Sequence, residues 1–193
     1  MELMDLYRRT VDTWTHALDG VGPQHWDGPT PCTEWTVRDL VNHVVGEDAW
    51  TAPLMRGATI ADVGESLDGD LLGGEPQAVA RHSAHEAVAA VEQTFAEGGV
   101  VHLSYGDETQ GEYLRQLAAD HLVHSWDLAA AVGGETALDP ELVNEVADWF
   151  GDREELYRGA GAIGPRVDHH AMDPQATLLA ASGRDPSWTP ATR

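Results

Sequence analysis

The sequence contains no lysine and only one cysteine, Cys32. All 11 basic residues are therefore arginines, and the 33 acidic residues give a formal net charge of −22. Nucleic-acid binding requires clustered basic side chains that neutralise phosphates, so we expect no nucleic-acid partner and no binding to an anionic membrane. A single cysteine excludes an intramolecular disulfide and a cysteine-rich zinc site.

Long apolar runs are also missing. Nowhere do about 18 apolar residues follow one another, as a membrane-spanning helix requires. Residues 1–7 lack the basic and apolar segments of a secretory signal, so we expect a cytoplasmic protein. A length of 193 residues, of which 42% are hydrophobic, fits a single globular domain over residues 1–193.

Apolar residues recur at three- and four-residue spacing in five segments, which predicts five helices. Thr36 with Asp39, and Thr109 with Glu112, form capping-box patterns in front of two of them. The predicted helices cover residues 3–18, 37–53, 80–95, 110–132 and 140–150. Four long helices with connections of unequal length predict an all-α fold: a four-helix bundle with one additional helix and an irregular C-terminal tail.

The connections differ in composition. Residues 20–35 are rich in glycine, proline and threonine, and the tryptophans in this loop indicate that it covers part of the bundle. Residues 56–74 are acidic and glycine-rich, with one short helical turn expected around Ile60. Residues 100–105 alternate and favour a strand, but they are too few to form a sheet core.

Three polar residues fall on apolar stripes of the predicted helices. His43 lies on the apolar side of the second helix, and Asp120 and His124 share the stripe of Leu117 and Leu128. Residues four apart project from nearly the same side of a helix, so Asp120 and His124 can share one ion. Two imidazoles and a carboxylate suit a divalent metal, with zinc favoured and Fe²⁺, Ni²⁺ or Mn²⁺ as alternatives.

Other interpretations of these residues stay open at this point. An inward histidine is more often a hydrogen-bonded core residue, and an aspartate four residues before a histidine can simply pair with it. His121 is an alternative ligand to Asp120, or a catalytic residue that moves protons. Asp127 is a candidate acceptor for an imidazole N–H. Glu47, one turn after His43, is a candidate general base or an additional metal ligand.

Three stretches resemble the DinB-like superfamily. They are T-P-C-T-E-W-T-V-R-D-L-V-N-H-V at residues 30–44, D-H-L-V-H-S-W-D-L-A at residues 120–129, and G-R-D-P-S-W at residues 183–188. The resemblance runs from the first helix to Trp188, nearly the whole chain. The nearest branch is an actinobacterial metal-binding group related to the N-terminal domain of mycothiol-dependent maleylpyruvate isomerase.

The resemblance implies that His43, Asp120 and His124 are the metal ligands, and it selects Asp120 over His121. In the family the carboxylate is often glutamate, whereas this sequence has the shorter aspartate. The resemblance also implies an enzyme that uses a thiol such as mycothiol, as an S-transferase or isomerase acting on a small-molecule substrate through a metal-bound thiolate.

Two other functions are considered beside the thiol-dependent enzyme. One is a metal-dependent hydrolase or lyase that uses no thiol, in which the metal activates water. The other is a non-catalytic metal-binding interaction protein whose acidic surface meets a basic partner. In each case we expect a monomer or a homodimer.

Overall fold

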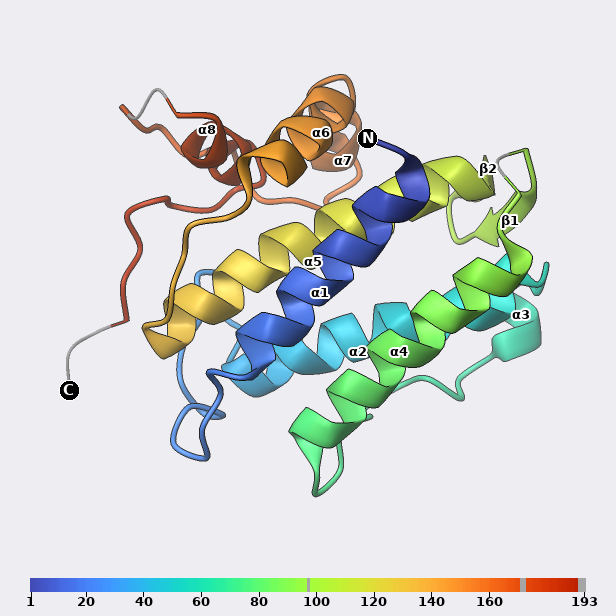
Figure 1. Ribbon diagram of the computed structural model, residues 1–193, viewed down its shortest axis with the longest axis horizontal. Helices are drawn as coiled ribbons and strands as arrows, with labels where there is room; N and C mark the ends of the chain where they lie inside the picture. Colours follow the sequence, from blue (N-terminus) through green and yellow to red (C-terminus); the bar gives the residue numbers. More distant parts are fainter. Residues whose placement is uncertain (97, 171–172, 191–193) are drawn as a thin grey trace.

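The computed structural model describes residues 1–96, 98–170 and 173–190. Four long helices form the bundle, and Figure 1 shows them packed side by side, with the shorter helices of residues 140–181 along one side of the bundle. The elements are α1 (Leu3–Leu18), α2 (Val37–Met55), α3 (Ile60–Val63), α4 (Pro76–Thr94), β1 (Val100–Leu103), β2 (Gly106–Thr109), α5 (Gln110–Val132), α6 (Pro140–Gly151), α7 (Glu154–Gly159) and α8 (Pro174–Ala181). The predicted all-α bundle is confirmed.

Helix α5 contacts two other long helices, α6 and both strands of the hairpin. It packs along α1 and against α2, while α2 also packs along α4. The main core contains Trp14 from α1, Leu40 from α2, Val91 from α4 and Leu114 from α5, each with no more than a trace of exposed surface. From His121 to Ala130, every residue of α5 is buried. A polar side chain in this part of α5 therefore needs a partner from another element.

The starts of two helices follow the predicted capping chemistry. At α2, the Thr36 side chain accepts a hydrogen bond from the Asp39 N–H, and the Asp39 carboxylate accepts one from the Thr36 N–H, which completes a capping box. The same arrangement of Thr59 and Asp62 begins α3, the short turn expected around Ile60. Both boxes satisfy backbone N–H groups that have no partner within the helix.

Only one of the two hydrogen bonds predicted for the capping box of Thr109 and Glu112 is present. The Thr109 side chain accepts from the Glu112 N–H at 3.0 Å, as predicted. The Glu112 carboxylate, however, accepts two hydrogen bonds from the Arg153 guanidinium and one from the Trp149 indole. Glu112 is therefore used to join the start of α5 to the end of α6. The segment before α5, residues 100–109, is a two-stranded antiparallel hairpin, β1 and β2.

The C-terminal region contains more regular structure than the predicted irregular tail. Helices α7 and α8 follow α6, and α8 packs against α6. Leu142 and Val146 of α6 share a second core cluster with Leu122 of α5 and Leu178 of α8. The periodicity of α8 is weak because five of its eight residues are buried, on more than one side, so no amphipathic pattern marks it.

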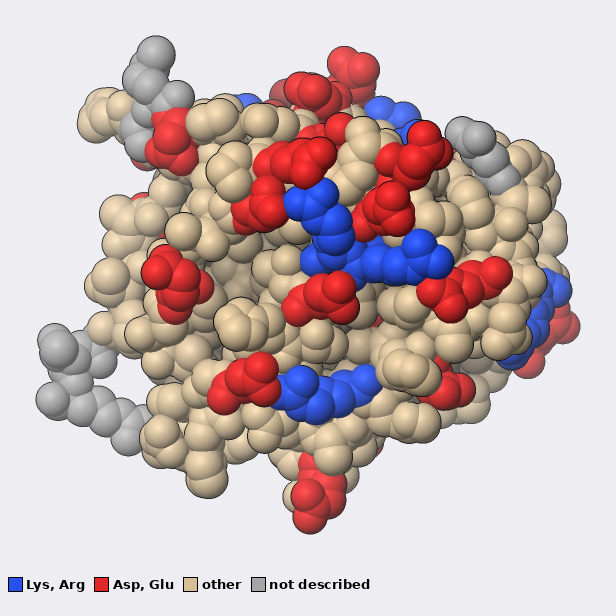
Figure 2. Space-filling view, in the orientation of Figure 1, with Lys and Arg blue, Asp and Glu red and all other residues tan. Residues whose placement is uncertain are grey.

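The acidic surface is interrupted by ion pairs. Figure 2 shows acidic side chains beside each group of arginines on one face of the molecule. Arg9, for example, contacts both Asp139 and Glu141 at 2.7 and 2.6 Å. In the part of the chain that the structure describes, no helix combines the length and apolar character needed to cross a bilayer.

The two capping boxes give a matched test of how α2 is stabilised. We expect Thr36→Ala to lower the free energy of unfolding by about 1 kcal/mol, because the Asp39 N–H in the first turn of α2 loses its acceptor. Thr59→Ala removes the same hydrogen bond from α3, which buries no residue, and should change stability much less. Urea unfolding followed by circular dichroism measures both, and equal losses would contradict this interpretation.

Candidate functional site

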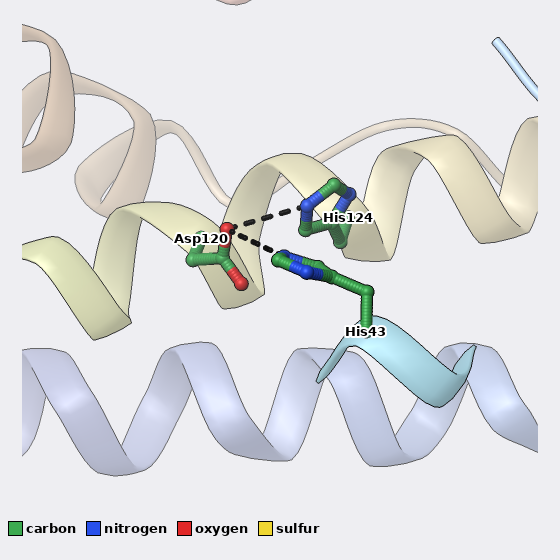
Figure 3. Close-up of side chains that lie close together, drawn as sticks. All are labelled: His43, Asp120 and His124. Carbon is green, nitrogen blue, oxygen red and sulfur yellow. Dashed lines mark hydrogen bonds and ion pairs between the residues drawn. The ribbon is translucent and has the colours of Figure 1, made fainter. Parts of the chain in front are cut away.

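His43 on α2 and Asp120 and His124 on α5 point toward one another (Figure 3). The Asp120 Oδ1 atom lies 3.5 Å from His43 Nε2 and 3.3 Å from His124 Nε2. One ligand atom from each residue lies within 4.8 Å of the other two. The two α5 residues are neighbours because they are one helical turn apart, and α2 brings the third donor from across the bundle.

The three donors fit a divalent metal. Ligands about 2.0–2.1 Å from a tetrahedral ion lie roughly 3.3 Å from one another, close to the two distances that Asp120 makes. Asp120 Oδ2 is buried and has no hydrogen-bond partner among the described residues. A buried carboxylate oxygen without a partner is costly, and a cation at this position would relieve the cost.

The charges of the three side chains are strongly linked. Burial raises the pKa of Asp120, but His124 and His43 outweigh burial and hold that pKa well below its usual range. Burial lowers the pKa of His124, but Asp120 and then Asp127 outweigh burial and raise it to about 9. Without a metal, His124 therefore keeps a proton at neutral pH, and a metal ion has to displace that proton to bind.

A second row of residues fixes the orientation of His124. The Asp127 carboxylate lies 2.9 Å from His124 Nδ1, which leaves Nε2 facing Asp120. Asp127 is fully buried and accepts hydrogen bonds from the Arg184 guanidinium at 3.0 and 3.2 Å. Such a carboxylate behind a ligating imidazole selects its tautomer and increases its basicity. Asp127 thus has the position predicted for an acceptor of an imidazole N–H.

The turn after α8 positions Arg184 beside Asp127. Gly183 has a φ of +81°, and a Cβ atom there would lie 3.1 Å from the backbone of Gly164, so this turn requires glycine. Backbone hydrogen bonds from Gly183 and Arg184 to the last turn of α8 hold the turn in place. The arginine side chain then reaches Asp127 and approaches Cys32 Sγ at 3.7 Å.

The loop before α2 covers the histidines, as its tryptophans suggested. The Trp35 ring centroid lies 4.9 Å from that of His43 and 5.9 Å from that of His124. Glu34 holds a φ of +73°, an unfavourable conformation for a residue other than glycine, and a hydrogen bond from the Trp35 N–H to the Cys32 carbonyl closes this turn. The strained turn places both Cys32 and Trp35 beside the donors.

The donors open on a cavity of about 430 Å³. Glu47, four residues after His43 on α2, also lines it. Burial raises the pKa of Glu47, and the nearby Asp120 carboxylate raises it further. Burial also raises the pKa of the Cys32 thiol, which Arg184 offsets only in part. Cys32 is therefore a neutral thiol in the cavity wall at neutral pH.

His121 does not join the other candidates. It is fully buried and does not line the cavity, and its ring lies against Tyr7 of α1 and Asp48 of α2. His121 Nε2 lies 3.1 Å from Asp48 Oδ1 and His121 Nδ1 lies 2.8 Å from the Leu117 carbonyl. Both of its nitrogens thus have partners, which gives the predicted catalytic role of His121 no support from the geometry.

Sequence reasoning did not identify Arg184 or Asp48 as parts of this region. Arg184 lies 57 residues from Asp127 in the chain, and Asp48 lies 73 residues from His121. No local spacing links either pair. The one available signal was that Arg184 falls within the third stretch of the family resemblance, residues 183–188.

Comparison with known proteins supplies the family. Residues 7–129, which include all three donors, match the family described as the mycothiol maleylpyruvate isomerase N-terminal domain. The chain belongs to this family. The matched range ends before Arg184, so the cation behind Asp127 comes from outside the part that the family description covers.

Two family relatives come from strains of Mycobacterium tuberculosis and are named as the uncharacterized proteins Rv0738 and MT0763. Each is 32% identical to this chain over 145 residues, which is 75% of this chain and 75% of the relative. No solved structure matches the chain.

The raised pKa of His124 predicts a pH dependence of stability. Between about pH 6.5 and pH 9 the folded, metal-free protein keeps a proton on His124 that the unfolded chain releases. The free energy of unfolding should therefore fall by up to about 3 kcal/mol as pH rises through this range.

Urea unfolding of the metal-free protein at several pH values measures this loss. The variant His124→Gln should show a flatter dependence, while His82→Gln, which replaces an exposed histidine on α4, should follow the wild type. Identical curves for wild type and His124→Gln would rule out the assigned charge on His124.

Proposed function

We propose that this protein is a metal-dependent enzyme that uses a small thiol such as mycothiol to attack an electrophilic substrate. His43, Asp120 and His124 would hold the metal. The observation that carries the proposal is the position of these donors, which lie together in the lining of a cavity large enough for a small molecule. The family description, which names mycothiol, supports a thiol as the co-substrate.

A bound divalent ion would supply positive charge that favours the thiolate form of a thiol beside it. Glu47 would accept the proton of the thiol S–H group. Its position in the cavity wall and its raised pKa suit proton transfer near neutral pH. The sulfur electron pair would then form the bond to the electrophilic carbon, while the bond from that carbon to the leaving group breaks and the leaving group departs with its electron pair.

The side chains around the donors have supporting roles in this proposal. Asp127 and Arg184 would keep the His124 ring in one orientation, and Trp35 would shield both imidazoles from bulk water. Cys32 would stay a neutral thiol and would not act as the nucleophile.

Metal content tests the first part of the proposal. Elemental analysis of purified wild type should find close to one divalent ion per chain. His43→Ala and His124→Ala should each lose most of it, because two protein ligands hold an ion much more weakly than three. His82→Ala, on the exposed side of α4, should keep the wild-type content. A wild type without metal, or full content in His124→Ala, would contradict the assigned ligands.

Thiol-dependent turnover tests the second part. The metal-loaded protein is incubated with mycothiol and a panel of electrophiles that includes a chlorodinitrobenzene, which releases chloride as the carbon–sulfur bond forms. We expect turnover that requires the thiol and is lost with chelator. Glu47→Gln should reduce kcat about a hundredfold or more while retaining the metal, and Glu86→Gln, on the exposed side of α4, should not.

Two results of this experiment would refute the proposal. The first is the absence of turnover together with no heat of mycothiol binding in calorimetry. The second is turnover that persists when thiols are rigorously excluded, since that result would assign the site to a hydrolase or lyase.

A further inference from the structure

Part of the cavity wall takes no part in the proposed chemistry. Apart from the donors, the wall includes side chains from α6, α7 and the segment after α7, among them Trp149, Phe150, Tyr157 and Ile163. The three aromatic rings contact one another, with centroids 6.0–6.3 Å apart, and the Phe150 and Tyr157 rings are stacked. We call these three residues the aromatic end of the cavity.

Positive charge is scarce around this cavity. Of the described residues that line it, Arg184 is the only arginine, and its charge is compensated by the buried Asp127 carboxylate. Arg153 lies over the Trp149 ring, 5.1 Å from its centroid, but it forms a two-pronged ion pair with Glu112. Each guanidinium charge is therefore already compensated by a carboxylate of the protein.

The remaining charged groups of the wall disfavour an anion. Glu47 and Asp120 are carboxyl groups beside the donors, and the protonated His124 imidazole faces Asp120 and Asp127 with its two nitrogens, so its charge is compensated. No arginine other than Arg184 lies within the described lining. A carboxylate moved from water into such surroundings loses hydration without gaining a partner. A neutral ring loses little hydration and gains apolar and aromatic contacts.

We propose that the aromatic end binds an uncharged aromatic or alicyclic ring of the substrate, so that the electrophile is a neutral, apolar molecule rather than a dicarboxylate. The identification of this ring with the electrophile rests on the proposed function. The binding preference itself rests only on the lining of the cavity, and it can be tested with no metal and no thiol present.

Calorimetry with two probes of nearly equal size tests the preference. Naphthol is neutral at pH 7 and naphthoate carries one negative charge, and each is titrated into the full-length protein after chelator treatment, so that a metal cannot attract the anion. We expect naphthol to bind at least about tenfold more tightly. Equal affinities, tighter naphthoate binding, or no binding of naphthol would each overturn the proposal.

Removing one ring locates the site of binding. Trp149→Ala should weaken naphthol binding about five- to tenfold, because the ligand loses one aromatic partner. Trp50→Ala also removes a half-buried tryptophan, but one that lies outside the cavity, and should leave naphthol binding unchanged. Equal effects of the two substitutions would overturn the assignment of naphthol to the aromatic end.

Adding a charge tests the same idea without removing any packed side chain. Ala162 is exposed and lines the cavity, so Ala162→Arg should raise the affinity for naphthoate about fivefold or more. Ala160→Arg adds the same charge two residues away, outside the lining, and should have little effect. This pair decides the question if Trp149→Ala does not fold.

The two proposals fail in distinguishable ways. If naphthol binds as expected but no thiol-dependent turnover is found, the result supports the aromatic end as an apolar binding site and refutes the proposed chemistry. If turnover is found but the metal-free protein prefers naphthoate, the chemistry stands and the neutral electrophile is excluded.

Discussion

Burial of polar side chains on α5 is the constraint on which the site depends. His121, His124 and Asp127 all lie in the part of this helix that neighbouring elements enclose. Each buried polar group has to find a partner or destabilise the fold. Asp48 from α2 contacts the His121 ring, and Arg184 from beyond α8 forms an ion pair with Asp127. His43 from α2 contacts Asp120 beside His124. Packing of the bundle and assembly of the site are thus one process.

The bundle and the local part of the site were predictable because they follow from spacing along one helix. Helix α1 occupies the predicted residues 3–18, and the Thr36 capping box begins α2. Asp120 and His124 are one turn apart, so an α-helix brings them together. The crossing with α2, which adds His43, required only that the apolar stripes of two helices face each other.

Tertiary partners could not be predicted in the same way. Glu112 matched a capping box in sequence, yet Arg153 and Trp149 offered its carboxylate stronger partners. From its position in the sequence, His121 was as plausible a metal ligand as Asp120. Only the folded structure shows that its ring faces Asp48 instead. Partners separated by many residues leave no periodic trace, so their pairing is visible only once the chain is folded.

The pairing of Arg184 with Asp127 has a consequence for the order of folding during synthesis. The three donors are all present once α5 has formed, but the buried Asp127 carboxylate then has only the His124 imidazole as its partner, and Arg184 joins it when the turn after α8 has left the ribosome. A buried charge that lacks one of its partners destabilises the fold. A chain interrupted before residue 184 would therefore carry the three donors on a less stable helix than a chain that includes this arginine.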